Sequence, residues 1–165
     1  STNIGVGLIS HTNAGKTTLA RTLLRSDIGE IGDRAHVTDV SERHVLIESA
    51  AADVLELWDT PGFGDSARLY QRLKGQADPI GWALSQVWDR YADRPFWSGQ
   101  KALVSARQNC DVILYVINAS ELPEDARYVG TEMKILDWVG KPVILVLNQV
   151  GPLRSQAPRS SSSRG

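Results

Sequence analysis

A run of eight residues near the N-terminus carries the residue types that bind phosphate groups. Ser10–Thr17 reads SHTNAGKT; it follows the apolar stretch Ile4–Ile9 and precedes apolar residues with a helical period. In a strand-loop-helix context of this kind, backbone N–H groups and the positive end of the helix surround phosphate oxygens. Lys16 would reach the β- and γ-phosphates of a nucleotide, and the Thr17 hydroxyl would bind Mg²⁺. The usual pattern begins with Gly, so Ser10 at that position makes the motif less specific.

A second segment with residue types suited to phosphate chemistry follows another apolar stretch. Val54–Trp58 has the composition of a buried strand, and Asp-Thr-Pro-Gly follows at positions 59–62. Asp59 would hold a water molecule of a Mg²⁺ shell, and Gly62 would let its backbone N–H approach a γ-phosphate because no side chain blocks it. Taken alone, the segment could be an ordinary Pro-Gly turn. The two segments together predict a nucleotide site whose phosphate contacts come from Asn13, Ala14, Gly15, Lys16, Thr17 and Thr18.

These residues together resemble the G domain of the translation-factor class of GTPases, and Era-like and TrmE-like GTPases in particular. The resemblance extends from Ile4 to Asn148. In addition, the runs Ser10–Thr17, Leu57–Ser66 and Arg94–Trp97 are similar to a bacterial family in which an Era-like GTPase domain precedes a C-terminal domain of unknown function. The resemblance implies that the chain binds GTP or GDP with Mg²⁺, and that it is the N-terminal part of a longer protein.

The order of the apolar segments predicts an α/β fold. Strands are expected at Ile4–Ile9, His44–Glu48, Val54–Trp58, Asp111–Asn118 and Val143–Leu147, and helices at Lys16–Arg25 and Pro123–Val139. His44–Glu48 and Val54–Trp58 are close enough in sequence to form an antiparallel hairpin. The alternation of the other strands with helices predicts a mostly parallel sheet, whose ligand site lies at the carboxyl ends of the strands. The resemblance implies the three-layer fold of a P-loop NTPase G domain.

The resemblance implies one P-loop GTPase-like domain at residues 1–151, whereas residues 152–165 are dominated by Ser, Arg and Pro. The second stretch cannot bury an apolar core, and we expect a disordered tail or a tag-derived end. A G domain with all of its usual elements would add a last strand, a Ser-Ala-Lys-like loop and a final helix. No segment with these features is visible in the sequence, so the domain is expected to be incomplete at its C-terminal side.

The resemblance implies roles for residues outside the two segments as well. Asn13 corresponds to the Asn that binds K⁺ in TrmE-like GTPases, although an Asn in a loop also tolerates a left-handed turn. Thr38, in the loop after the first helix, would bind Mg²⁺ and sense the γ-phosphate; as an alternative, it lies at the edge of a strand. Asn148 and Gln149 occupy the guanine-reading motif, in which Gly151 replaces the usual Asp. Loss of this Asp is expected to weaken discrimination between guanine and adenine.

The sequence favours a GTPase switch that depends on Mg²⁺ and is stimulated by K⁺. The residues expected to act in the reaction are Lys16, Asn13, Thr38 and Gly62, and those expected to hold Mg²⁺ are Thr17, Thr38 and Asp59. Phe63 stands where many GTPases have a Gln that orients water, so we expect slow intrinsic turnover. The alternative is a degenerate G domain that binds nucleotide or a partner without efficient hydrolysis. An ATPase or small-molecule kinase with the same loop is disfavoured by the Asp-Thr-Pro-Gly segment.

The segment 65–109 is longer than the usual connection in this class and is rich in aromatic residues. Leu84, Val87, Trp88 and Tyr91 fall at helical spacing, which predicts an amphipathic helix that packs on the domain. The alternative is an exposed surface for an effector, because aromatic residues are enriched at interfaces. Asp-Arg-Pro at positions 93–95 predicts a turn.

The composition is ordinary for one soluble domain: 165 residues, a 42% hydrophobic fraction and a net charge of −1. This charge gives no bulk attraction to nucleic acid or to an anionic membrane. No apolar run is long enough to span a membrane and no signal peptide is visible, so we expect a cytoplasmic protein. The single cysteine, Cys110, is expected to be a buried apolar residue. The partners that the resemblance implies are a guanine nucleotide, a second G domain and an effector protein.

Overall fold

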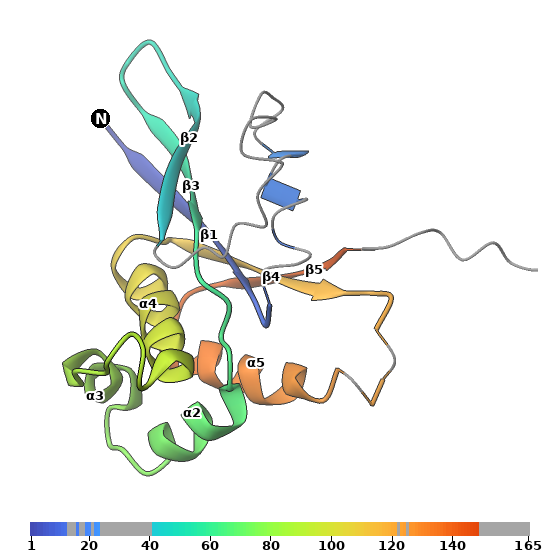
Figure 1. Ribbon diagram of the computed structural model, residues 1–165. Coiled ribbons are helices and arrows are strands. Elements are labelled where there is room, and N and C mark those ends of the chain that lie inside the picture. The colour runs from blue at the N-terminus through green and yellow to red at the C-terminus, as the bar shows by residue number, and fades with distance from the viewer. Residues whose placement is uncertain are drawn as a thin grey trace, which may run out of the picture.

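The computed structural model describes residues 1–12, 16, 19–20, 22–23, 41–121, 123–124 and 126–148. Within these residues, five strands form one sheet in the order β2-β3-β1-β4-β5 (Figure 1). The strands are β1 (Asn3–Ser10), β2 (Glu42–Glu48), β3 (Val54–Asp59), β4 (Val112–Asn118) and β5 (Val143–Asn148). Neighbours from β3 through β1 and β4 to β5 are parallel, and β2 pairs antiparallel with β3. The predicted α/β fold with a mostly parallel sheet and an antiparallel hairpin is confirmed.

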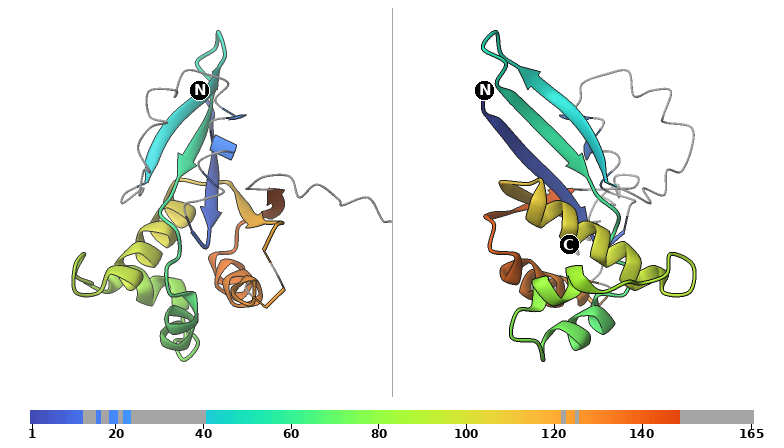
Figure 2. Two further views of the ribbon diagram at one scale, coloured as in Figure 1. Left: turned by 45° about the vertical axis from the view of Figure 1, so that its right-hand side comes forward. Right: turned by 90° about the vertical axis from the view of Figure 1, so that its left-hand side faces the viewer.

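Four helices gather on one side of the sheet, and the β2–β3 hairpin extends beyond them (Figures 1 and 2). They are α2 (Ser66–Leu73), α3 (Pro79–Ser85), α4 (Arg94–Gln108) and α5 (Tyr128–Val139). A separate helical segment includes Leu19 and Ala20. In the described ranges of the chain, no helix has the length and apolar character that crossing a bilayer requires.

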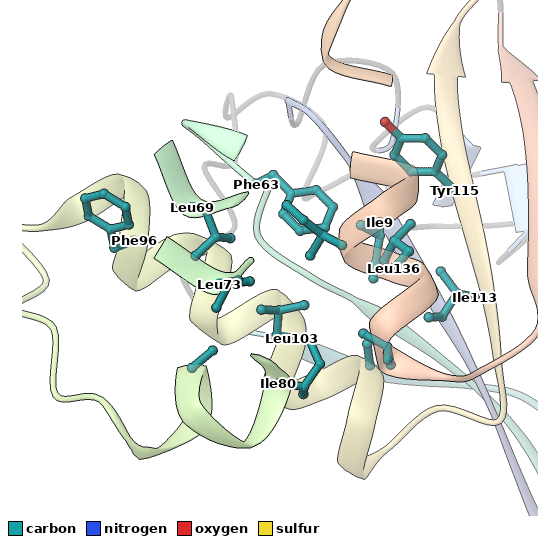
Figure 3. Packing of buried hydrophobic residues seen from close by; sticks show 14 residues of the cluster. Ile9, Phe63, Leu69, Leu73, Ile80, Phe96, Leu103, Ile113, Tyr115 and Leu136 are labelled. Atoms are coloured by element: carbon teal, nitrogen blue, oxygen red, sulfur yellow. The ribbon is translucent and has the colours of Figure 1, made fainter. Parts of the chain in front are cut away.

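The carboxyl half of the central strand β1 is buried on both faces of the sheet, as a three-layer arrangement requires. Leu8 and Ile9 are consecutive in β1, so their side chains point to opposite faces, and both are fully buried. On the face of Leu8, Ala20 packs with Leu57. The face of Ile9 carries a larger cluster, which Figure 3 shows from close by. Its members include Phe63, Leu69, Leu73, Ile80, Phe96, Leu103, Ile113, Tyr115, Ile135 and Leu136.

Two glycines let the end of α4 approach β1 closely. A Cβ at Gly5 would lie 2.0 Å from the carbonyl oxygen of Asn109, and a Cβ at Gly7 would lie 2.6 Å from Sγ of Cys110. Two hydrogen bonds hold the contact: Gly5 N–H donates to Oδ2 of Asp111 at 2.8 Å, and Asp111 N–H donates to the Gly5 carbonyl at 2.7 Å. β1 is therefore fixed between β3, β4 and the end of α4, which gives its carboxyl end a defined position.

Cys110 is almost fully buried, and burial raises the pKa of its thiol to about 11. At pH 8 only about one such thiol in a thousand is deprotonated, and the thiolate is the reactive form. We therefore expect the native protein to react with a thiol-specific reagent at least about 100-fold more slowly than protein unfolded in guanidinium chloride. The rate of chromophore release from an aromatic disulfide reagent checks this. A native rate close to the unfolded rate would mean that the thiol is exposed.

The helix predicted at Pro123–Val139 begins later than expected. α5 starts at Tyr128, and the described residues before it form turns, in which Ala126 N–H donates to the Pro123 carbonyl at 3.3 Å. This bond joins residues three apart, which is the tighter winding of a turn rather than that of an α-helix. The predicted end is correct, because Gly140 adopts a left-handed conformation with φ of 77° and closes the helix.

The amphipathic helix predicted around Leu84–Tyr91 is not formed. α3 ends at Ser85, and Asp89 accepts hydrogen bonds from the N–H groups of Tyr91 and the next residue, at 2.8 and 2.7 Å. A side chain that captures nearby N–H groups favours a turn over a continued helix. Val87 and Tyr91 are 98% and 81% exposed, so the helical spacing of these residues does not mark a buried stripe.

The Asp-Arg-Pro segment begins a helix instead of forming a separate turn. α4 starts at Arg94 with Pro95 in its first turn, where the N–H that proline lacks would have no helical partner. The helix then carries Phe96 and Leu103 into the main cluster. Trp88, from the preceding loop, packs on Phe96 with ring centroids 5.5 Å apart. Most of the long segment 65–109 is thus helical: α4 packs against β1, and α2 and α3 pack on α4 and α5.

Candidate functional site

The carboxyl ends of β1 and β3 meet at one edge of the sheet. The two strands are parallel neighbours, and Leu8 pairs with Asp59 in their register. The Thr60 hydroxyl donates a hydrogen bond to the Leu8 carbonyl at 2.6 Å, which ties the segment after β3 to β1. The two sequence segments with phosphate-binding residue types therefore leave the sheet side by side.

A buried ion pair joins the two segments. Nζ of Lys16 lies 3.1 Å from Oδ1 of Asp59; the Lys16 side chain is fully buried and the Asp59 side chain is 12% exposed. Burial lowers the pKa of the Lys16 ammonium, although the negative charge of Asp59 opposes this change. Among the described residues, Nζ of Lys16 makes no hydrogen bond of good geometry. A buried ammonium with three N–H donors suits phosphate oxygens, and the adjacent carboxylate suits Mg²⁺.

Gly62 is packed against the start of the phosphate-binding run. A Cβ at this position would lie 2.8 Å from the carbonyl oxygen of His11 and 3.2 Å from Cα of Thr12, so a side chain does not fit without a shift of the backbone. The next residue is tied to the same run, because Phe63 N–H donates to the Ser10 carbonyl at 3.1 Å. The backbone around Gly62 is therefore held beside the run that contains Lys16.

Phe63, the residue after Gly62, has its side chain in the apolar core. The ring is fully buried, and Figure 3 shows it among the side chains of the main cluster. From the α4 side, the Ser98 hydroxyl donates to the Gly62 carbonyl, which anchors the backbone at this point. A buried apolar ring cannot orient a water molecule, so Phe63 serves packing at this position.

Two residues outside the predicted set extend the site toward α5. Nδ1 of His11 lies 2.5 Å from Oε2 of Glu132, a fully buried carboxylate on α5. The other carboxylate oxygen accepts a hydrogen bond from the Tyr115 hydroxyl at 2.7 Å, and the Tyr128 ring stacks on the His11 ring with centroids 3.8 Å apart. Burial tends to lower the pKa of His11, but the hydrogen bond and the negative charge of Glu132 outweigh it, so the pKa is raised above 6.5.

The sequence holds only a weak signal for this pair. The buried residues of α5 are Glu132, Ile135, Leu136 and Val139, so a carboxylate interrupts an apolar helix face. A charged residue in such a place is expected to have a partner, because an unpaired buried charge is costly. The partner itself is 121 residues away in sequence, and no local pattern connects the two.

A cavity of about 480 Å³ opens beside the His11 ring. It lies between the phosphate-binding run, the segment after Gly62 and the start of α5. Its lining consists of His11, Gly64, Asp65, Ser66, Ala67, Arg127, Tyr128 and Thr131. Acidic and basic side chains thus both line this cavity, which lies next to the backbone of Gly62.

Asn148 lies apart from the ion pair. It ends β5, pairs with Asn118 of β4, and accepts a hydrogen bond from Ala119 N–H at its carbonyl, 2.9 Å away. β4 stands between β5 and β1 in the sheet, so the structure does not bring Asn148 next to Lys16. The other predicted site positions lie outside the described residues: Asn13, Ala14, Gly15, Thr17, Thr18, Thr38, Gln149 and Gly151, together with the predicted tail at 152–165.

Known proteins with similar sequence or fold are GTPases. GTPase Der of Sulfurimonas denitrificans is 28% identical over 147 residues, which cover 88% of this chain and 23% of the relative. The chain thus spans less than a quarter of the length of this curated relative. A crystal structure of Era in complex with MgGDPNP and nucleotides 1506–1542 of 16S ribosomal RNA matches with a TM-score of 0.55 at 22% identity, over 93% of this chain and 42% of that chain. The likeness to Era shows that the two share a fold.

The family comparison covers nearly the whole domain. The family described as 50S ribosome-binding GTPase matches residues 5–149, a range that includes the buried Lys16–Asp59 pair, Gly62 and Asn148. The resemblance to Era-like GTPases of the translation-factor class is thereby confirmed. The chain belongs to the 50S ribosome-binding GTPase family and has the G-domain fold of that class.

Proposed function

We propose that this domain binds a guanine nucleotide with Mg²⁺ and hydrolyses GTP to GDP and phosphate as a molecular switch. The observation that carries the proposal is the Lys16–Asp59 ion pair, 3.1 Å long and buried where two parallel strands end. It sets a cation that suits phosphate beside a carboxylate that suits Mg²⁺, next to the backbone of Gly62. Membership of a GTPase family and the likeness to GTPase Der support the same activity.

Each residue of the proposed site has one task. The Lys16 ammonium would neutralise the charge of the β- and γ-phosphates, and the Gly62 N–H would contact the γ-phosphate. Asn148 and Gln149 would contact the base. The remaining phosphate contacts would come from Asn13, Ala14, Gly15, Thr17 and Thr18, and the residues that would hold Mg²⁺ are Thr17, Thr38 and Asp59. Mg²⁺ supplies charge neutralisation across the phosphates when it is bound.

Hydrolysis is proposed to be slow without a partner. Attack of water on the γ-phosphate depends on positioning and on electrostatic stabilisation. The buried ring of Phe63 cannot orient the attacking water, and this observation also favours a second candidate function. In that alternative the domain binds nucleotide as an interaction module without efficient hydrolysis. An effector protein or a second G domain would then supply or receive the signal. We place the domain and this partner in the cytoplasm.

Release of inorganic phosphate tests the reaction. The domain is mixed with GTP or ATP, in Mg²⁺ and again with a chelator in excess. We expect slow release from GTP that stops with the chelator, and less release from ATP. Saturable binding of GTP without release would favour the interaction module. Equal release from ATP would mean that the base is not discriminated, as the replacement of the usual Asp by Gly151 allows.

Asn13 carries the proposal that K⁺ stimulates hydrolysis. Its amide oxygen suits a hard monovalent cation, which would neutralise charge that develops between the β- and γ-phosphates. We expect kcat for GTP to be several-fold higher in K⁺ than in Na⁺ at the same ionic strength, and Asn13→Ala to remove the difference. Phosphate release in matched chloride buffers measures both. Equal rates of the unaltered protein in the two salts would contradict this role.

A further inference from the structure

The carboxylate of Glu132 is fully buried, and both of its oxygens are engaged. Oε1 accepts from the Tyr115 hydroxyl at 2.7 Å, and Oε2 lies 2.5 Å from Nδ1 of His11. A buried charge is costly unless it is paired and hydrogen-bonded, so the contact with His11 is what permits a carboxylate at this point of α5. An apolar side chain would fill the same space at lower cost, because the buried face of α5 is otherwise apolar. Stability alone therefore does not explain the pair.

The imidazole of His11 is fixed both in direction and in plane. Its Nδ1 edge faces Glu132, and its face stacks on Tyr128 with an interplanar angle of 10°. The Tyr128 hydroxyl donates in turn to Oε2 of Glu121 at 2.6 Å. Asp65, at the N-terminus of α2, is a further carboxylate whose charge acts on the ring. The ring cannot rotate without loss of the hydrogen bond and of the stack.

The backbone of His11 belongs to the phosphate-binding run. Its carbonyl oxygen lies 2.8 Å from the point where a Cβ of Gly62 would stand, and the Ser10 carbonyl accepts from Phe63 N–H at 3.1 Å. The Ser10 hydroxyl also donates to the Thr12 carbonyl. The side chains of Ser10 and His11 thus both contribute to holding the start of the phosphate-binding run. This is the place where the usual motif begins with glycine.

In the described part of the chain, helix α5 therefore reaches the phosphate-binding run through Glu132 and Tyr128, which both contact the His11 ring, and only Glu132 forms an ion pair with it. We propose that Glu132 is a positioning residue, which holds the entry of the run in the geometry that phosphate binding needs by anchoring His11 to α5 and β4. The proposal rests on the proposed nucleotide site, since it concerns the loop of that site. Glu132 acts through His11 and not on the nucleotide. Loss of the anchor is expected to let residues 10–12 move, and phosphate binding by the run that follows them then weakens.

Paired substitutions separate this role from ordinary packing. The double variant H11F/E132M replaces the ion pair by apolar groups, so the fold is kept while the anchor is lost. His11→Asn keeps an N–H donor near the position of Nδ1 and serves as the conservative rescue. The matched control is Arg107→Met, which removes the hydrogen bond of 3.0 Å from Nη1 of Arg107 to the Val139 carbonyl at the other end of α5.

Four quantities are measured for each protein: the melting temperature, the Kd for GDP, the KM for GTP, and, in the nucleotide-free protein, the rate of amide hydrogen exchange in peptides that span residues 8–16. For H11F/E132M we expect a melting temperature lowered by only a few degrees, because the buried Tyr115 hydroxyl loses its acceptor, together with a Kd raised about tenfold or more and faster exchange in these peptides. KM for GTP should rise by a similar factor. The rescue variant and Arg107→Met should keep Kd and exchange within about threefold of the unaltered protein.

Unaltered affinity and exchange in H11F/E132M would overturn the proposal. If that variant does not fold, His11→Leu is compared with His11→Asn: a loss of affinity confined to the Leu variant supports the proposal, and equal affinities overturn it. If the unaltered protein binds no GDP, the proposed function fails. Amide hydrogen exchange in the nucleotide-free proteins then still tests the positioning role of Glu132. Faster exchange in the variant without the anchor supports this role, and unchanged exchange overturns it.

Discussion

Lys16→Met is expected to lower the affinity for GDP and GTP by about 100-fold or more, because it removes the one buried cation placed to meet the phosphates in the described part of the site. Met keeps most of the side-chain volume. The substitution also takes the buried positive charge away from Asp59, so we expect the free energy of unfolding to fall by about 3 kcal/mol. Titration calorimetry at a temperature where the variant is fully folded measures the affinity, and chemical denaturation measures the stability.

A double variant distinguishes the loss of binding from the loss of stability. K16M/D59N removes both charges of the buried pair, so the stability is expected to recover while nucleotide binding does not. Lys74→Ala is the matched control, since Lys74 is an exposed lysine at the end of α2. Recovery of binding in K16M/D59N, or equal losses in Lys16→Met and Lys74→Ala, would show that Lys16 does not hold the phosphates.

Gly62→Ala is expected to lower the rate of GTP hydrolysis by about 100-fold, because a backbone shift of about 1 Å is enough to misplace a group in the transition state. The added Cβ would stand 2.8 Å from the His11 carbonyl oxygen, so the two backbones must move apart. Stability should fall by about 1–3 kcal/mol for the same reason. The affinity for a non-hydrolysable GTP analogue should fall more than the affinity for GDP, since GDP has no γ-phosphate for the Gly62 N–H to contact.

Gly75→Ala provides the matched control for this substitution. A Cβ at Gly75 would have no heavy atom within 4 Å, so the change adds the same methyl group without a clash. Hydrolysis by Gly75→Ala should match that of the unaltered protein. A Gly62→Ala variant with the turnover and the analogue affinity of Gly75→Ala would contradict the proposed contact between Gly62 and the γ-phosphate.

The strands and their mostly parallel pairing follow from local sequence patterns, whereas the order of the strands does not. Short apolar runs that alternate with helices predict parallel strands, and β1, β3, β4 and β5 have this arrangement. The spacing of His44–Glu48 and Val54–Trp58 likewise predicts the hairpin that β2 and β3 form. These features depend on residues that are close in sequence, so the sequence of one chain suffices to predict them.

Other features depend on competition between contacts that a pattern does not show. The apolar spacing around Leu84–Tyr91 indicates a helix, but the Asp89 side chain captures two N–H groups and forms a turn instead. The start of α5 shifts to Tyr128 because the residues before it form turns. The pairing of His11 with Glu132 joins positions far apart in sequence, and only the packing of α5 on the sheet brings them together.

Titration of the unaltered domain with GDP, and in parallel with ADP, in Mg²⁺ and K⁺ buffer tests the central claim most directly. The account predicts one saturable site for GDP, weaker binding of ADP, and loss of both in Lys16→Met. Absence of saturable binding of either nucleotide to the folded domain would contradict the claim that the buried Lys16–Asp59 pair marks a nucleotide site.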